Sequence, residues 1–186
     1  MALVEEQEEG EGALGSGGLL RRYAVGSEVE VQMADSGFHG AYYEAIITAR
    51  LPDSGRYEVV FSTLVEEGGG GPLREAVAPA NVRPRPSPSG VARGGLNVFD
   101  MVEAYHNDGW WPGVVSGAWP AGTVGEPRYA VSFPTVPEVV ELVASLVRPR
   151  RAFVRGRWID MQQVVSLLLS NACSVAPKFG ACLNFI

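Results

Sequence analysis

Polar and apolar residues alternate along several short stretches of the chain. Glu28–Val31 and Tyr57–Phe61 carry an apolar residue at every second position, which is the period of a strand with one buried face. Turn-forming residues, such as those of Asp53–Gly55, separate these stretches. Five short strands are therefore predicted in the first half of the chain, at Glu28–Val31, Tyr42–Thr48, Tyr57–Phe61, Leu73–Val77 and Asn81–Arg83.

The second half of the chain repeats this order of residues. Four segments have a counterpart further along: Gly26–Val31 in Phe99–Ala104, Gly40–Ile47 in Asp108–Val115, Gly55–Phe61 in Pro127–Phe133, and Ala80–Pro84 in Ser145–Pro149. The corresponding strands are predicted at Met101–Tyr105, Trp110–Ser116, Tyr129–Phe133, Val139–Val143 and Leu146–Arg148. A repeat of this kind indicates two copies of one small module.

The fold class predicted from the repeat is all-β, with two small, strongly bent β-barrels in tandem. Residues 1–21 are rich in Glu and Gly without any period, which predicts a disordered acidic tail. The two domains are placed at 22–86 and 96–158, joined by a linker at 87–95, and 159–186 are predicted to form an irregular tail. A module this small buries only about 60% of its unfolded surface, so the two copies are expected to pack against each other.

The formal net charge of −6 comes largely from the predicted tail. Five of the 21 acidic residues lie there: Glu5, Glu6, Glu8, Glu9 and Glu11. The remainder is close to neutral and lacks the broad basic field that holds duplex nucleic acid. One local arginine cluster follows the second copy and is interpreted as a solvated segment or as a contact for an anion: Arg148, Arg150, Arg151, Arg155 and Arg157.

Catalytic and metal-binding motifs are missing from the sequence. His39 and His106 occupy equivalent loops without cysteine partners or metal-site spacing, and no nucleophile elbow or phosphate loop is present. Cys173 and Cys182 form no disulfide framework, which indicates an intracellular chain. The N-terminus lacks the basic, apolar and small-residue series of a secretory signal. Val164–Leu169, the longest apolar stretch, is far shorter than a membrane span. We therefore expect a binding protein with no cofactor, metal, small-molecule substrate or membrane partner.

Aromatic residues end or begin three predicted strands of the second copy. In a bent barrel Tyr105, Trp111 and Phe133 are expected to meet at one rim, where three ring faces suit a methylated ammonium group. Asp108 would add a charge-assisted hydrogen bond to a lower methylation state. Trp110 points to the opposite side of the strand from Trp111, so it is assigned to packing beside the site.

The first copy offers a less complete set of rings. Its candidate residues are Tyr43, Tyr42, Phe38 and Phe61, with Met33 as a soft lining contact and Asp35 as the charge. Phe61 and Phe133 are equally well explained as plain core residues. Tyr57 and Tyr129 are expected on the strand surfaces.

The residues named so far resemble a known family. Val29–Val31, Gly37–Ala45, Pro72–Glu75 and Val82–Pro84 resemble the first half of a plant tandem Agenet module, and Asp100–Val115, Tyr129–Pro134 and Leu146–Pro149 resemble the second half. The resemblance covers about residues 22–158, although the first copy departs from it by having no aromatic residue at the end of its first strand. Agenet domains are similar to Tudor domains, which implies Tudor-like barrels.

This resemblance also implies a function and a location. Relatives of this kind are chromatin- or RNA-associated readers in the plant nucleus, commonly of methylated histone tails. We therefore expect a histone tail peptide carrying methylated lysine as the partner, lying extended across a groove where the copies pack together. The alternative is an RNA-binding or protein-interaction scaffold without methyl-lysine recognition.

Overall fold

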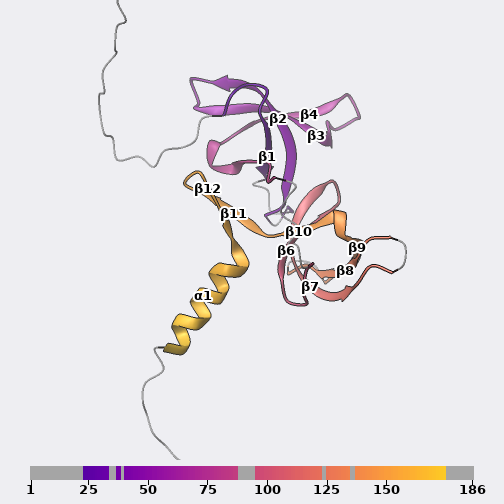
Figure 1. Ribbon diagram of the computed structural model, residues 1–186. Coiled ribbons are helices and arrows are strands. Elements are labelled where there is room, and N and C mark those ends of the chain that lie inside the picture. The colour runs from indigo at the N-terminus through magenta and orange to yellow at the C-terminus, as the bar shows by residue number, and fades with distance from the viewer. Residues whose placement is uncertain are drawn as a thin grey trace, which may run out of the picture.

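The computed structural model describes residues 23–33, 37–38, 40–87, 95–122, 125–134 and 137–174, with side chains as far as Leu167. The predicted acidic tail, most of the predicted linker, Asp35, His39 and residues 175–186 lie outside the described residues. Within them the chain forms two small barrels, the first above the second in Figure 1. The predicted all-β fold of two Tudor-like barrels in tandem is confirmed.

Each barrel has five strands in the same order. The first contains β1 (Glu28–Gln32), β2 (Tyr42–Leu51), β3 (Arg56–Val65), β4 (Pro72–Val77) and β5 (Val82–Pro84), with the short 3-10 helix η1 (Pro79–Asn81) before β5. The second contains β6 (Met101–His106), β7 (Gly109–Trp119), β8 (Arg128–Ser132), β9 (Val139–Val143) and β10 (Val147–Pro149), with η3 (Ala144–Leu146) before β10. The repeat in the sequence is thus a repeat of strand order.

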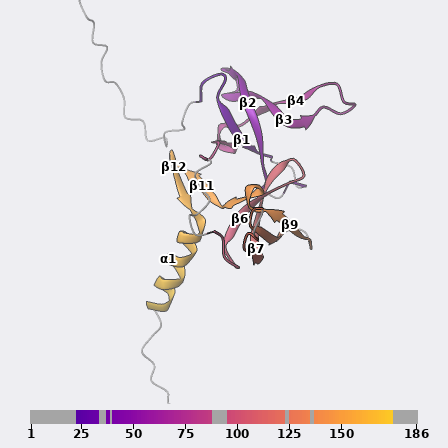
Figure 2. The same ribbon diagram turned by 45° about the vertical axis from the view of Figure 1, so that its right-hand side comes forward.

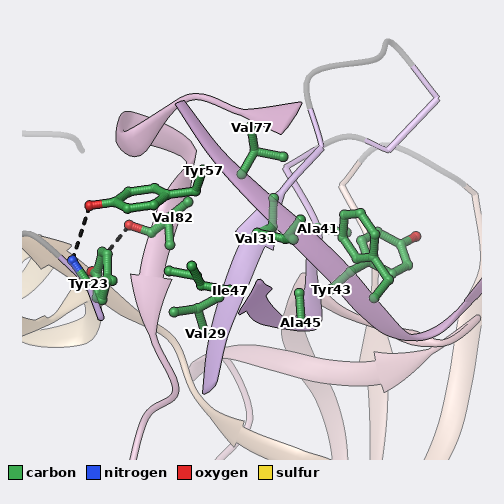
Figure 3. Close-up of a cluster of buried hydrophobic side chains, with 12 residues drawn as sticks. Tyr23, Val29, Val31, Ala41, Tyr43, Ala45, Ile47, Tyr57, Val77 and Val82 are labelled. Carbon is green, nitrogen blue, oxygen red and sulfur yellow. Dashed lines mark hydrogen bonds between the residues drawn. The ribbon is translucent and has the colours of Figure 1, made fainter. Parts of the chain in front are cut away.

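The alternation of β1 and β3 builds the core of the first barrel. Val29 and Val31 point inward from β1 and meet Tyr43, Ala45 and Ile47 of β2, as Figure 3 shows. Burial of these apolar side chains is the main stabilising term for so small a barrel. A second core of the same kind fills the other barrel.

The expectation that Tyr57 and Tyr129 lie on the strand surfaces is wrong. Both are buried, because each shares the inward face of its strand. The Tyr57 hydroxyl accepts a hydrogen bond from the backbone N–H of Tyr23 at 3.1 Å (Figure 3), and that of Tyr129 accepts one from Leu96 N–H at 3.2 Å. Each tyrosine thereby fixes the segment that leads into the first strand of its copy.

A left-handed turn also recurs in both copies. Gly26 has a φ of 84° and its N–H donates to the carbonyl of Ile47 at 2.8 Å. Phe99 holds the equivalent position with a φ of 76°, and its N–H donates to Val115 at the same distance. The Phe99 side chain is 79% exposed, so no packing compensates for its strained backbone.

The two barrels join through one strand pair. β2 and β7 run antiparallel and meet at Tyr42 and Trp110, which links both barrels into a single ten-stranded sheet. The expected packing of the copies against each other is therefore made partly by backbone pairing.

Four charged side chains pair where the barrels meet, and we call Glu30, Arg83, Glu103 and Arg148 the interdomain quartet; all but Arg148 are buried. Arg83 contacts Glu30 through Nε at 2.8 Å and Glu103 through Nη2 at 2.7 Å. Arg148 contacts Glu30 through Nη1 at 2.8 Å and Glu103 through Nη2 at 2.7 Å. Each arginine therefore bridges both carboxylates, and each carboxylate comes from a different barrel.

Strand alternation explains how a charged residue reaches this position. Glu30 lies between Val29 and Val31, so it points away from its own core, and only the second barrel takes it out of water. Burial opposes the charge of Arg83, but its hydrogen bond to Glu103 and the charges of both carboxylates outweigh burial and raise its pKa.

Residues 151–160 form a separate hairpin of β11 (Arg151–Val154) and β12 (Arg157–Asp160), most of which had been predicted as part of the second domain. The predicted irregular tail requires a correction, because α1 (Met161–Ser174) lies within it. The helix begins because the Asp160 carboxylate accepts a hydrogen bond from the N–H of Gln162 at 2.9 Å, as an N-cap does. Figures 1 and 2 both show α1 projecting away from the barrels. Among the described helices none is long and apolar enough to cross a membrane.

Candidate functional site

The candidate rings of the first barrel are closed off. Tyr43 is 2% exposed and Phe61 is 1% exposed, and the edge of Phe38 packs on Tyr43 with ring centres 5.5 Å apart. Met33 packs against the same core. These side chains are gathered as expected, but Tyr43 and Phe61 leave no open ring face for a ligand, and Phe38 and Met33 are half-buried.

The second barrel closes this site from outside. Trp111 packs against the cores of both barrels, and the backbone of Gly109 lies so near Tyr43 that a Cβ there would meet the ring at 2.8 Å. The Thr63 hydroxyl donates to the carbonyl of Asp108 at 3.1 Å. The β6–β7 hairpin of the second copy thus covers the position where the first copy would hold a ligand.

The rings of Tyr42 and Trp110 each contact an arginine side chain of the same protein. The Arg83 guanidinium carbon lies 3.4 Å from the centre of the Tyr42 ring, and that of Arg148 lies 3.8 Å from Trp110. The Trp110 indole N–H also donates to Glu44 at 3.2 Å. The packing role predicted for Trp110 therefore includes a cation–π contact, and one face of each ring is occupied.

Tyr105 lies on a different face from Trp111. Tyr105 pairs directly with Trp110 and its ring meets Trp110 edge-on at 5.2 Å, whereas Trp111 pairs with Ala104. Cross-strand partners share a face and successive residues do not. The structure therefore does not bring Tyr105 together with Trp111 and Phe133 at one rim.

His106 takes the place expected for Tyr105. The His106 ring stacks on Phe133 with centres 5.8 Å apart and planes at 20°, and its Nε2 lies 3.8 Å from the Glu138 carboxylate. Trp111 and Phe133 belong to the same core, and a Cβ on Gly113, two residues after Trp111, would lie 3.5 Å from the Phe133 ring. The group of Trp111, Phe133 and His106 is the second-copy rim.

The indole N–H of Trp111 is an unsatisfied hydrogen-bond donor among the described residues. Its indole nitrogen is buried and has no hydrogen-bond partner among the described residues, although the ring as a whole is half-buried. A buried N–H without an acceptor costs about 1–3 kcal/mol.

Asp108 faces the tyrosines rather than the second-copy rim. It occupies a tight turn with Asn107, where both residues have positive φ, as the Asn-Asp-Gly sequence predicts. Burial first, and the Asp108 charge second, raise the pKa of Tyr43, and the same two causes lead in raising the pKa of Tyr105. The charge of Asp108 therefore acts on both hydroxyls.

A cavity of about 500 Å³ opens between the barrels on the Trp110 side of the sheet. Its lining includes Glu28, Glu44, Arg85, Trp110, Ser145 and Arg148. Acidic and basic side chains are mixed, and Arg85 pairs with Glu44 at 3.1 Å and with Glu28 at 3.5 Å. A groove between the copies was expected, but it lies on the opposite face from Trp111.

Two five-stranded barrels that share one sheet, with aromatic groups at their rims, define a tandem of small Tudor-like barrels, a class of binding modules. Residues 26–87 match the family model of the Agenet domain. The first barrel is therefore an Agenet domain, and the two barrels together have the fold of solved tandem Agenet domains.

Similar proteins come from Arabidopsis thaliana. DUF724 domain-containing protein 6 is 29% identical over 150 residues, covering 78% of this chain and 21% of its own length. Protein AGENET DOMAIN (AGD)-CONTAINING P1 is 30% identical over 138 residues, covering 74% of this chain and 25% of its own. The chain thus spans about a quarter or less of these relatives. The crystal structure of Arabidopsis thaliana AGDP1 AGD34 matches with a TM-score of 0.64 and 26% identity, over 73% of this chain and 88% of that one.

Proposed function

We propose that the chain is a chromatin-associated reader in the nucleus, which binds methylated lysine on a histone tail through the second-copy rim. The observation that carries the proposal is the difference between the two barrels. Tyr43 and Phe61 are sealed in the first, whereas Trp111 and His106 remain half-buried in the second. The match of residues 26–87 to the Agenet domain, together with the Tudor-like fold of both barrels, supports the same class of ligand.

The chemistry of the second-copy rim fits a methylated ammonium. Trp111 and His106 present half-buried rings, the buried Phe133 ring lies behind His106, and each cation–π contact contributes about 0.5–2 kcal/mol. The free indole N–H of Trp111 suits a backbone carbonyl of the peptide. Glu138, beside His106, adds a negative charge at the edge of the group.

The test is a titration of the full chain with histone tail peptides in unmodified, mono-, di- and trimethylated forms. His106→Ala and Trp111→Phe are expected to weaken binding of the methylated peptide roughly three- to tenfold, because each removes one favourable contact. His106→Phe should retain binding. Phe38→Ala, a ring in the sealed first barrel, is the matched control and should bind like the parent chain.

Two results would sink the proposal. One is equal affinity for methylated and unmodified peptides. The other is methyl-dependent binding that survives in His106→Ala and Trp111→Phe while Phe38→Ala abolishes it, which would move the site to the first barrel. Melting temperatures of all variants show whether a loss of binding reflects a loss of folding.

A further inference from the structure

The two arginines of the interdomain quartet occupy equivalent positions. Arg83 of β5 pairs with Glu30 across the strands, and Arg148 of β10 pairs with Glu103 in the same register. One face of each guanidinium lies on an aromatic ring, Tyr42 for Arg83 and its strand partner Trp110 for Arg148. Each arginine therefore has the same two neighbours, a glutamate across the strands and an aromatic ring on one face of its guanidinium group.

The β11–β12 hairpin also contacts the guanidinium group of Arg83. The Trp158 ring of β12 lies 5.5 Å from the guanidinium carbon, and Trp158 is held by its neighbour Phe153 at 5.2 Å. Arg83 Nη1 also donates to the carbonyl of Arg151 at 3.1 Å, where β11 begins. An extended segment thus supplies both an aromatic ring and a backbone acceptor, and the Arg83 side chain is only 4% exposed.

Arg148 has no such cover among the described residues. Trp110 is the one described ring within cation–π distance, and the Arg148 side chain is 17% exposed. The cavity of about 500 Å³ lies at this place, lined by Arg148, Trp110 and the Arg85–Ser87 segment that follows β5. That segment is equivalent to the start of the β11–β12 hairpin, which follows β10.

We propose that this cavity is a second peptide-binding site, which takes an aromatic side chain from an extended segment of another protein. The ring contacts the Arg148 guanidinium as the Trp158 ring contacts that of Arg83. The occupant is defined by its chemistry: a planar aromatic side chain within an extended, basic-flanked peptide.

Two further features of the cavity fit this occupant. Arg85 Nε is buried and has no hydrogen-bond partner within the described part of the chain, so it can donate to a peptide carbonyl, as Arg83 donates to Arg151. The carboxylates of Glu28 and Glu44 line the same cavity, and the Glu28 side chain is 65% exposed. A basic residue beside the aromatic one can therefore pair with Glu28.

The probe for this site is a synthetic decapeptide with the sequence of residues 151–160, RAFVRGRWID, which carries a basic residue next to its tryptophan. It is titrated into the full chain by calorimetry and by chemical-shift mapping, beside a version with alanine at the tryptophan position. The tryptophan peptide is expected to bind roughly tenfold more tightly, because one ring contact with a desolvated cation contributes about that factor.

Variants of the protein locate the binding. Pro86→Trp places a ring of the chain in the cavity and should abolish binding, while Arg85→Ala should weaken it several-fold. Arg74→Ala is the matched control, since Arg74 also pairs with a carboxylate, Glu58, but far from the cavity. His106→Ala should leave this binding unchanged, which separates the site from the second-copy rim.

The proposal is overturned by equal affinity for the tryptophan and alanine peptides, or by an absence of binding and of shifts around Trp110 at millimolar peptide. Binding that persists in Pro86→Trp, in a chain with a native circular-dichroism spectrum, also overturns it. If Pro86→Trp does not fold, Arg85→Ala decides: affinity equal to that of Arg74→Ala refutes the site.

Discussion

Replacing Glu30 with glutamine should destabilise both barrels together. Glu30 is completely buried and holds Arg83 and Arg148 through contacts of 2.7–2.9 Å. The interdomain quartet contains two carboxylates and two guanidinium groups, so it is neutral as a whole. In Glu30→Gln one buried positive charge loses its counter-charge, and the amide group turns a donor toward two groups that have only donors.

The size of the effect follows from this imbalance. Breaking a buried ion pair by removing one partner costs about 3–5 kcal/mol. A chain of this size has an unfolding free energy of roughly 5–15 kcal/mol, so Glu30→Gln should remove a large part of it. Glu58→Gln is the matched control, because Glu58 is 40% exposed and lies 3.8 Å from Arg74, and it should cost less than about 1 kcal/mol.

Urea denaturation followed by tryptophan fluorescence and by circular dichroism measures the change. The parent chain should give a single transition at the same urea concentration by both probes. Glu30→Gln should lower the midpoint, and its fluorescence and circular-dichroism transitions should no longer coincide if the two barrels unfold separately. The double variant Glu30→Gln with Arg148→Met restores neutrality and should recover part of the loss. A loss in Glu30→Gln no larger than that in Glu58→Gln would refute the reasoning.

Three further predictions concern single residues. Phe99→Gly should raise the unfolding free energy by about 0.5–1 kcal/mol in urea denaturation, because relief of the left-handed strain outweighs the added freedom of the unfolded chain; no gain would contradict this. Gly113→Ala should lower the melting temperature and cost about 1–3 kcal/mol of unfolding free energy, because its Cβ would lie 2.5 Å from a Val131 methyl. Gly37→Ala is the control, since its Cβ would meet nothing within 4 Å and the change should be neutral. The free energy of unfolding should be constant below about pH 10 and fall above it. The reason is that Tyr43 and Tyr105 have raised pKa values in the folded chain, so they stay protonated at a pH where the same tyrosines of the unfolded chain are ionised. Tyr43→Phe should therefore show a shallower fall in urea midpoint between pH 9 and 11.

The strands and their duplication could be predicted because both depend on local pattern. Alternation places Val29, Val31 and Phe61 in the core, and the Asn-Asp-Gly turn predicts the β6–β7 hairpin. The helix α1 was missed because its apolar residues show no clear period, yet Asp160 two residues before Gln162 was an available N-cap signal.

The candidate site was harder to predict because it depends on which face each ring takes. A shift of one residue moves a side chain to the other face of a strand, and this separates Tyr105 from Trp111 and brings His106 to Phe133. The repeat had placed His106 in a loop, although its position two residues after Ala104 puts it on the Trp111 face.

The interdomain quartet could not be read from either copy alone. Glu30 occupies a polar position of an alternating strand, which predicts an exposed side chain, and Arg148 belongs to an arginine cluster that was interpreted as solvated. Only the pairing of β2 with β7 brings residues from both barrels close enough to neutralise one another.

The interdomain quartet is itself part of the repeat. Each barrel contributes one glutamate, one arginine and one ring to the contact, so the surface is complementary to a copy of itself, as in an isologous dimer. The repeat therefore extends from the strands of each barrel to the surface through which the barrels meet, and the β11–β12 hairpin, which covers Arg83 and not Arg148, is the part that breaks this likeness.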